Sequence, residues 1–206
     1  MPTRPLRLVV FDATQQRRPP ALLGTSWRVG SGLYRALGRV DASYGARSFA
    51  DMFSWLAEVG GDRLIGEVQF WGHGKWGRIL IDREALDRSS LRPTHPHHQG
   101  LLRLKARLAP SALLWFRTCE TLGALAGQRF AVELADFTGA RIAGHTYIIG
   151  FFQSGLHCLA PGARPNWSPW EGLGSGSPEA PRRALTSRLG APGTITCLTS
   201  KPPSSW

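Results

Sequence analysis

Two side chains that can perform covalent chemistry together, a thiol and an imidazole, each follow a short apolar run in this sequence. Cys119 comes directly after residues 113–118 (LLWFRT), and His73 comes after residues 64–72 (LIGEVQFWG), 46 residues before the cysteine. A thiol attacks a carbonyl as its thiolate, and a nearby histidine is the usual base that lowers the thiol pKa or accepts its proton. We therefore interpret Cys119 as a nucleophile and His73 as its base.

The elements that must position these two side chains are parallel strands. An apolar run of four or five residues that ends at a break is typical of a strand covered on both faces of a sheet. Ligands of open α/β sheets collect at the carboxyl ends of such strands. Gly72 and Gly74 flank the histidine, and glycine lets a substrate carbonyl approach backbone N–H groups closely. We expect Cys119 and His73 to meet at one edge of a sheet.

The two motifs together resemble the caspase-like cysteine peptidases, the fold shared by caspases, metacaspases, separase-type CHAT domains and a bacterial caspase-like domain. The resemblance rests on Gly72-His73-Gly74, with Gly77 beyond it, and on residues 117–121 (RTCET). Histidine precedes cysteine by about 50 residues in caspases. Residues 127–146 are also similar to the helix and strand that follow the cysteine in the bacterial domain. The resemblance spans residues 6–150 and lacks the pentapeptide of caspases proper.

This resemblance implies a cysteine endopeptidase that hydrolyses peptide bonds with a His73–Cys119 dyad. The backbone N–H groups of Cys119 and Gly74 would hold the oxyanion that develops on the attacked carbonyl. No cofactor is expected. The expected partners are a protein or peptide substrate and an activator or other partner protein, and not a membrane.

Arg117 carries the expectation about substrate choice. In the caspase-like fold the position two residues before the nucleophile helps to line the pocket for the residue that precedes the scissile bond. Alternation along a strand places residue 117 on the same face as Cys119. The guanidinium fork matches a carboxylate in bidentate fashion, so we expect cleavage after Asp or Glu. In the competing interpretation Arg117 is already neutralised by Asp12 or Glu120, and Asp12 would be the pocket acid if cleavage instead followed Arg or Lys.

The remaining periodicities predict an α/β fold with a mostly parallel sheet flanked by helices on both faces, which the resemblance specifies as a three-layer sandwich. Residues 6–11 form a first strand with Asp12 at its carboxyl end. Phe49, Met52, Phe53 and Leu56 predict a helix over residues 48–59, with Ser48 as its N-cap. Further segments complete the pattern: helices over 100–108 and 127–138, and strands over 78–82 and 141–150.

The composition changes to Pro, Gly and Ser over residues 160–193, which we expect to form a long loop. Trp167 and Trp170 argue against disorder, because disordered segments are poor in aromatic residues. We expect this loop to lie over the cleft and to supply one wall of the substrate site through Trp167 or Trp170. A short helix is expected over 178–189, a strand over 194–198 that closes the sheet, and a tail over 199–206.

Three histidines, His95, His97 and His98, raise the question of a metal site. Two prolines break this run, and metal-binding histidines need a fixed scaffold with partners of their own, so we expect a solvated loop and no metal. His145 lies within a predicted strand, where we expect it to pack or to make a hydrogen bond.

Length and composition set the broad class of the protein. A chain of 206 residues with 42% hydrophobic residues suits one domain over 1–206 with a sizeable core. The three cysteines Cys119, Cys158 and Cys197 follow no disulfide spacing, so reduced thiols in the cytoplasm are expected. We expect neither a signal peptide nor a membrane span, because no apolar run is long enough.

Two other functions stay open. In the first, the protein is a catalytically inactive caspase-like domain that keeps Cys119 and His73 and acts as a binding module. The formal net charge of +11 suggests nucleic acid, but the arginines are dispersed and no basic-aromatic motif appears, which favours a solvated basic surface. Salt-dependent binding to DNA or RNA would support the nucleic-acid function.

Overall fold

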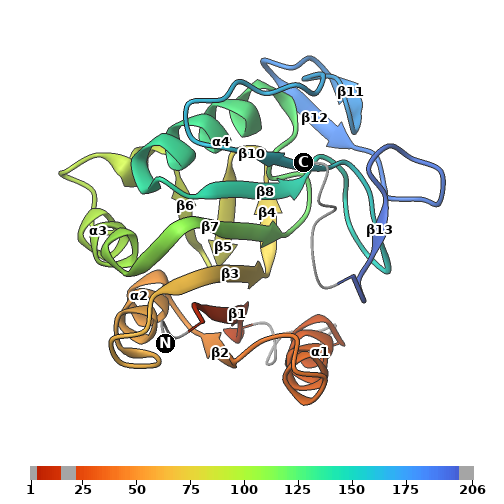
Figure 1. The fold of residues 1–206 in the computed structure, drawn as a ribbon. Coiled ribbons are helices and arrows are strands. Elements are labelled where there is room, and N and C mark those ends of the chain that lie inside the picture. The colour runs from red at the N-terminus through yellow and green to blue at the C-terminus, as the bar shows by residue number, and fades with distance from the viewer. Residues whose placement is uncertain (1–3, 15–21, 200–206) are drawn as a thin grey trace.

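The computed structural model describes residues 4–14 and 22–199, and a mostly parallel six-stranded sheet forms its centre (Figure 1). The order of strands across the sheet is β10-β8-β7-β3-β1-β2, and only β10 runs antiparallel to its neighbour. The six strands are β1 (Leu6–Asp12), β2 (Ala42–Ala46), β3 (Ile65–Trp71), β7 (Leu108–Arg117), β8 (Arg141–His145) and β10 (Leu156–Leu159). The α/β class and the parallel sheet expected from the sequence are confirmed.

Three smaller antiparallel sheets surround the large one (Figure 1). The first follows β3 directly and consists of β4 (His73–Lys75), β5 (Arg78–Ile81) and β6 (Glu84–Asp87). The second is the hairpin of β11 (Leu173–Gly176) and β12 (Pro181–Ala184). The third pairs β13 (Ile195–Thr196) with β9 (Phe152–Gln153).

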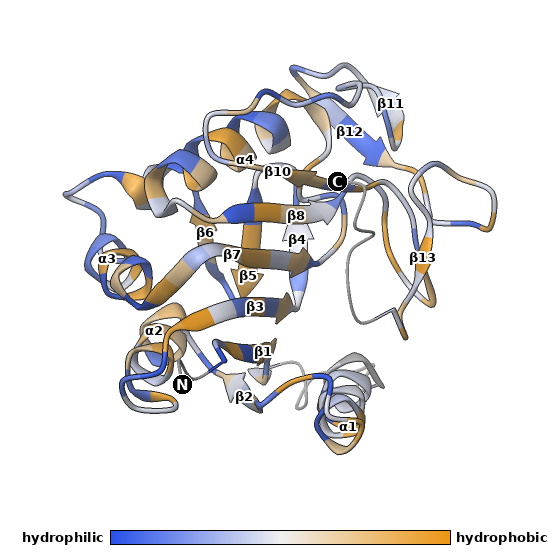
Figure 2. Ribbon diagram, viewed as in Figure 1, coloured by the Kyte–Doolittle hydropathy of each residue, from blue (hydrophilic) through white to orange (hydrophobic). Residues whose placement is uncertain are grey.

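Four α-helices accompany the sheets in the described part of the chain: α1 (Leu22–Ala36), α2 (Phe49–Glu58), α3 (His98–Arg107) and α4 (Ala124–Thr138). Helix α2 begins as predicted, because the Ser48 side chain accepts a hydrogen bond from the Asp51 backbone N–H at 3.0 Å. Its predicted apolar stripe is buried. Figure 2 shows apolar residues along most of β7 and in the middle of β8, whereas the helices alternate apolar and polar residues.

Side chains of β1 divide between two hydrophobic clusters. Leu8 and Val10 join the larger cluster, which includes buried residues of α2, α3 and α4. Val9 and Phe11 join a smaller cluster with Tyr34 of α1. Successive side chains of a strand point to opposite faces, so the two clusters lie on opposite sides of the sheet.

Most elements predicted from periodicity are confirmed, with boundaries displaced by a few residues. Two predictions in the C-terminal part are wrong. Residues 178–189 contain strand β12 and no α-helix, and β13 pairs with β9 instead of closing the large sheet. The segment 160–193, predicted as a loop, contains the β11–β12 hairpin. Of the predicted tail 199–206, residues 200–206 lie outside the described residues.

Helix α1 is an element that the sequence did not predict. Glycines at 24, 30 and 32 interrupt its apolar pattern, and glycine is a poor helix former. Packing supplies the stability that propensity lacks, because the ring of Tyr34 is buried edge-on against Trp71 of β3 at 5.1 Å. Within residues 4–14 and 22–199, none of the helices has the length and apolar content that a bilayer crossing requires.

Candidate active site

The two candidate catalytic residues follow neighbouring strands whose ends are in register. Trp71, the last residue of β3, pairs with Arg117, the last residue of β7. His73 and Cys119 each come two residues later, so both leave the sheet at the same edge and from adjacent strands. The structure therefore brings together the two chain segments that the sequence singled out.

The order of the strands marks the same edge. β2 lies on one side of β1 and β3 on the other, so the connections change direction between β1 and β3. Crevices at such switch points, outside the carboxyl ends of the strands, are where open α/β sheets bind ligands. Asp12 ends β1 at this point, and a Cβ added at Gly72 would lie 3.5 Å from the Asp12 Cβ.

The segment after β7, residues 118–123, is called the nucleophile loop here, and it packs directly on the backbone of β4. A Cβ added at Gly74 would lie 2.2 Å from the Thr121 Oγ1 and 2.7 Å from the Thr118 Cβ. Only glycine allows this approach. In the next turn the Gly77 N–H donates to the Thr121 carbonyl at 2.9 Å. These contacts hold the segments of His73 and Cys119 against each other.

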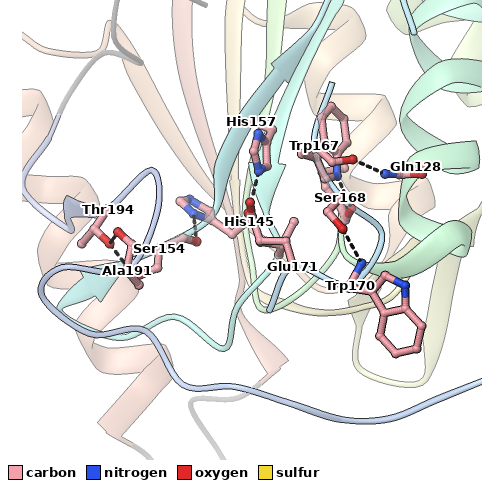
Figure 3. Close-up of polar contacts among 12 residues, drawn as sticks. Gln128, His145, Ser154, His157, Trp167, Ser168, Trp170, Glu171, Ala191 and Thr194 are labelled. Atoms are coloured by element: carbon pink, nitrogen blue, oxygen red, sulfur yellow. Dashed lines mark hydrogen bonds and ion pairs between the residues drawn. The ribbon is translucent and has the colours of Figure 1, made fainter. Parts of the chain in front are cut away.

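Backbone hydrogen bonds also fix the nucleophile loop to the chain after β8. The Glu120 N–H donates to the Tyr147 carbonyl and the Leu122 N–H to the His145 carbonyl, each at 2.9 Å. His145 is fully buried, and its Nδ1 lies 3.1 Å from the Ser154 carbonyl (Figure 3). Burial lowers the pKa of His145 to about 3. The expectation that His145 packs and makes a hydrogen bond is confirmed.

Cys119 is partly buried in a position that keeps its thiol protonated. Burial is the main cause that raises its pKa to about 11, and the neighbouring Glu120 adds to the rise, while the Ile149 carbonyl, 4.0 Å from Sγ, acts in the opposite direction. His73 is also partly buried, and its ring lies edge-on to that of Trp27 of α1 at 5.6 Å. A reaction at this thiol therefore requires a base that removes the proton as sulfur attacks.

Two carboxyl groups lie beside the candidate nucleophile and base. The fully buried Asp12 accepts hydrogen bonds through Oδ1 from the Thr14 N–H and hydroxyl, at 2.8 and 2.6 Å. Its Oδ2 and the Oε2 of Glu120 are buried and have no hydrogen-bond partner among the described residues. Glu120 has a φ of +34°, a strained conformation for a side chain larger than glycine. Unsatisfied buried carboxyl oxygens are costly, which is a feature of functional sites.

The expected role of Arg117 in substrate binding is not supported by its surroundings. The side chain is only 4% exposed and is held by neutral acceptors. It donates to Tyr34, Gln153 and Gln69, and to the backbone carbonyls of Thr196, Cys197 and Thr199. The competing pairing with Asp12 or Glu120 is also not observed. The arginine is a buried anchor for the C-terminal segment and not an open pocket charge.

Trp167 and Trp170, both expected to form a wall of the substrate site, have different environments (Figure 3). Trp167 is 6% exposed, and its indole N–H donates to the Leu122 carbonyl of the nucleophile loop at 3.1 Å. Its ring stacks on His157 at 4.6 Å, and Glu171 lies 2.6 Å from the His157 Nε2. Trp170 is 60% exposed. Trp167 therefore supports the nucleophile loop, and only Trp170 presents a large open surface.

Trp167→Phe is expected to destabilise the fold by about 1–2 kcal/mol, because the indole hydrogen bond to the Leu122 carbonyl and part of the stacking are lost. Trp170→Phe is the matched control, and its exposed position predicts a change within about 0.5 kcal/mol. Urea unfolding of both variants measures the difference. Equal effects of the two substitutions would contradict the supporting role of Trp167.

Glu120 gives the fold a distinctive pH dependence. Burial raises its pKa from 4.5 to about 7, although Lys75 acts in the opposite direction. Between about pH 4.5 and 7 the Glu120 carboxyl is therefore protonated in the folded protein but ionised in the unfolded chain. The contribution of Glu120 to the free energy of unfolding falls as pH rises through this range, because ionisation favours the unfolded chain. Glu120→Gln should remove this fall in the free energy of unfolding, which is at most about 1.4 kcal/mol per pH unit. Unfolding free energies of both proteins across this range test it, and parallel curves would contradict it.

The three histidines of the segment before α3 are parts of aromatic packing. His97 lies against Phe49 at 5.2 Å and against His95 at 5.0 Å between ring centroids, and His98 lies against Phe137 at 5.5 Å. Burial lowers the pKa of His97, with a smaller contribution from His95. The expectation of a solvated loop is wrong for His98, which is buried at the start of α3.

Sequence reasoning missed Trp27 as a neighbour of the site. Trp27 and Tyr34 are seven residues apart, and this spacing places them on one face of a helix, which was the available signal. Comparison of the chain with protein-family models, with curated proteins and with solved structures finds no match. The functional assignment therefore rests on the residues and their geometry.

Proposed function

We propose that this protein is a cysteine endopeptidase of the caspase-like kind, with Cys119 as the nucleophile and His73 as the general base. One observation carries the proposal: the segments bearing a thiol and an imidazole leave adjacent, in-register strand ends and are packed together through Gly74. The proposal includes a three-layer arrangement. Tyr34 of α1 packs with Val9 on the side of β1 opposite the cluster that includes the other helices, which supports it.

The proposed reaction follows from the high pKa of the thiol. His73 accepts the proton of Cys119 as sulfur attacks the carbonyl carbon of the scissile peptide bond. The carbonyl oxygen becomes negatively charged, and the N–H groups of Cys119 and Gly74 would stabilise it. The N–H groups of Glu120 and Leu122 already bind carbonyls elsewhere. His73 then donates the proton to the leaving amine, and a water molecule hydrolyses the thioester to release the acid and the thiol.

The proposed substrate carries a basic residue before the scissile bond. The sequence favoured an acidic residue because of Arg117, but the guanidinium of that arginine already donates its hydrogen bonds to neutral acceptors of the protein itself. Asp12, at the switch point of the sheet, and Glu120, next to the nucleophile, each have a carboxyl oxygen that lacks a partner in the described structure. A lysine or arginine side chain would supply the missing hydrogen-bond donors and the opposite charge.

The proposal is tested with thiol-reactive peptidyl inhibitors that differ only in the residue before the reactive group. Inhibitors with Arg or Lys should label Cys119, identified by mass spectrometry, and peptides with the same residues should be cleaved. If inhibitors with Asp or Glu labelled Cys119 in preference to those with Arg or Lys, the basic substrate would be contradicted and Arg117 would again be the candidate for substrate recognition. Equal labelling of Cys158 or Cys197 would show simple thiol reactivity and contradict an organised site.

The second candidate, a binding module without turnover, is favoured by one observation. Burial keeps the Cys119 thiol protonated, with a pKa of about 11, and a protonated thiol is a weak nucleophile. Under this alternative Cys119 would resist every inhibitor while the protein still bound peptides. Labelling and peptide binding measured on the same sample separate the two functions.

A further inference from the structure

Helix α1 carries a row of large apolar side chains on its outer surface. Val29, Leu33 and Leu37, the last just beyond the helix end, are 66%, 45% and 55% exposed. Residues four apart lie above one another on a helix, and the Leu37 N–H still donates to the Leu33 carbonyl, so the row is continuous. Single exposed apolar residues are ordinary, but a contiguous row is typical of an interaction site.

Basic residues form the other edge of the same surface. At about 100° per residue, Arg28 and Arg35 lie on one side of the helix, and both are exposed. Gly32 and Ala36 lie between this edge and the apolar row, also exposed, and a Cβ added at Gly32 would meet no atom within 4 Å. The sequence from residue 22 to residue 40 contains no Asp or Glu. The surface thus has an apolar edge, a low centre and a basic edge.

We propose that this surface of α1 docks an amphipathic helix of a partner protein with an acidic edge. Apolar residues of the partner would cover Val29, Leu33 and Leu37, and its carboxylates would meet Arg28 and Arg35. The apolar row spans two helical turns, about 12 Å, which matches the i, i+4, i+8 pattern of a docking helix. The small residues in the centre let the two helix backbones approach each other. The proposal is independent of whether Cys119 is a nucleophile.

Charge decides between this partner and a second copy of the chain. In a symmetric dimer the same surface meets itself, which brings the arginine edges of two chains with a net charge of +11 together. A lipid surface is less suited, because helices that lie in the membrane interface present aromatic residues with their aliphatic ones. The tryptophan of α1, Trp27, packs instead against His73.

The inner face of α1 connects the docking surface to the candidate active site. Trp27 contacts the His73 ring, and the Tyr34 hydroxyl accepts a hydrogen bond from Arg117 at 2.7 Å. A partner that fixes α1 therefore fixes the surroundings of His73. This position suits an activator protein.

The test uses a fluorescein-labelled helical peptide of about 20 residues, with leucines along one face and glutamates along one flank. A second peptide has lysines in place of the glutamates, and vesicles of anionic lipid are the third probe. Fluorescence anisotropy should show that the protein binds the acidic peptide at least about tenfold more tightly than the basic one, with affinity falling as salt rises.

Variants locate the binding surface. Leu33→Asp, and separately Arg28→Glu with Arg35→Glu, should each weaken binding of the acidic peptide by about tenfold or more. Leu189→Asp, at a site that is 79% exposed outside α1, and Arg103→Glu on α3 should leave binding unchanged. Thermal unfolding checks that each variant is folded. The proposal is overturned if the acidic peptide does not bind, if both peptides bind equally, if control variants weaken binding equally, or if only vesicles bind.

Discussion

Cys119→Ala is expected to abolish peptide hydrolysis, and His73→Ala to lower kcat by at least about a hundredfold. Without sulfur no thioester forms, and without the imidazole no group removes the proton from a thiol whose pKa is about 11. The two residues act as one unit, so the double variant should be no slower than Cys119→Ala alone. Cleavage of a fluorogenic peptide with Arg or Lys before the scissile bond measures all three.

Controls for this prediction come from the chain itself. Cys158→Ala and Cys197→Ala remove the other two thiols and should retain turnover. Circular dichroism must show that each variant keeps its fold. Wild-type turnover in Cys119→Ala would remove the peptidase proposal altogether. If His73→Ala kept full activity while Cys119→Ala had none, Cys119 would still be the nucleophile, but a residue other than His73 would have to be the base.

Arg117→Met should cost about 3 kcal/mol or more of unfolding free energy. Methionine fills much of the apolar volume but donates no hydrogen bond, so the Gln153 Oε1 loses its buried donor, and the Tyr34 hydroxyl and the Cys197 carbonyl each lose one of their hydrogen bonds. Each buried acceptor left without a partner costs roughly 1–3 kcal/mol. The guanidinium also lies over the Trp115 ring at 4.7 Å, and that interaction is lost as well.

Hydrogen exchange shows whether this cost has the expected origin. Amides of residues 195–199 should lose protection in Arg117→Met, because the arginine holds the carbonyls of this segment. Arg103→Met is the matched control on the exposed surface of α3, and it should change stability by less than about 0.5 kcal/mol. Unchanged protection of residues 195–199 would mean that β13 and β9 hold the segment without the arginine.

Four strands of the central sheet, β1, β3, β7 and β8, and the edge at which the candidate site lies were predictable because their signals are local, whereas β2 and β10 were not predicted. The apolar runs before His73 and Cys119 each predict a strand without information from other parts of the chain. Parallel strands place their carboxyl ends at one edge of the sheet. The helix over residues 48–59 was similarly encoded by its own stripe and cap. Periodicity therefore predicted these elements without knowledge of their neighbours.

The failures concern features set by residues far apart in the sequence. Alternation along β7 gave no information on what surrounds Arg117, because the acceptors around its charge come from residues 34, 69, 153, 196, 197 and 199. The hairpin of β11 and β12 uses Gly172 and Gly176 at positive φ, where composition suggested only a loop. Helix α1 depends on tertiary packing that overrides its glycines. None of these contacts can be inferred from a local window.

The network around Arg117 also constrains when the protein can finish folding. The Tyr34 hydroxyl lies 2.8 and 2.9 Å from the carbonyls of Cys197 and Thr199, which share its one hydrogen, across separations of 163 and 165 residues. During synthesis the arginine and the tyrosine leave the ribosome long before these acceptors exist. Until those carbonyls are in place, the guanidinium lacks several of the acceptors that surround it in the folded protein. Native packing of α1 around Arg117 therefore depends on a segment more than 160 residues away in the sequence, and contacts of such long range slow the folding of a chain.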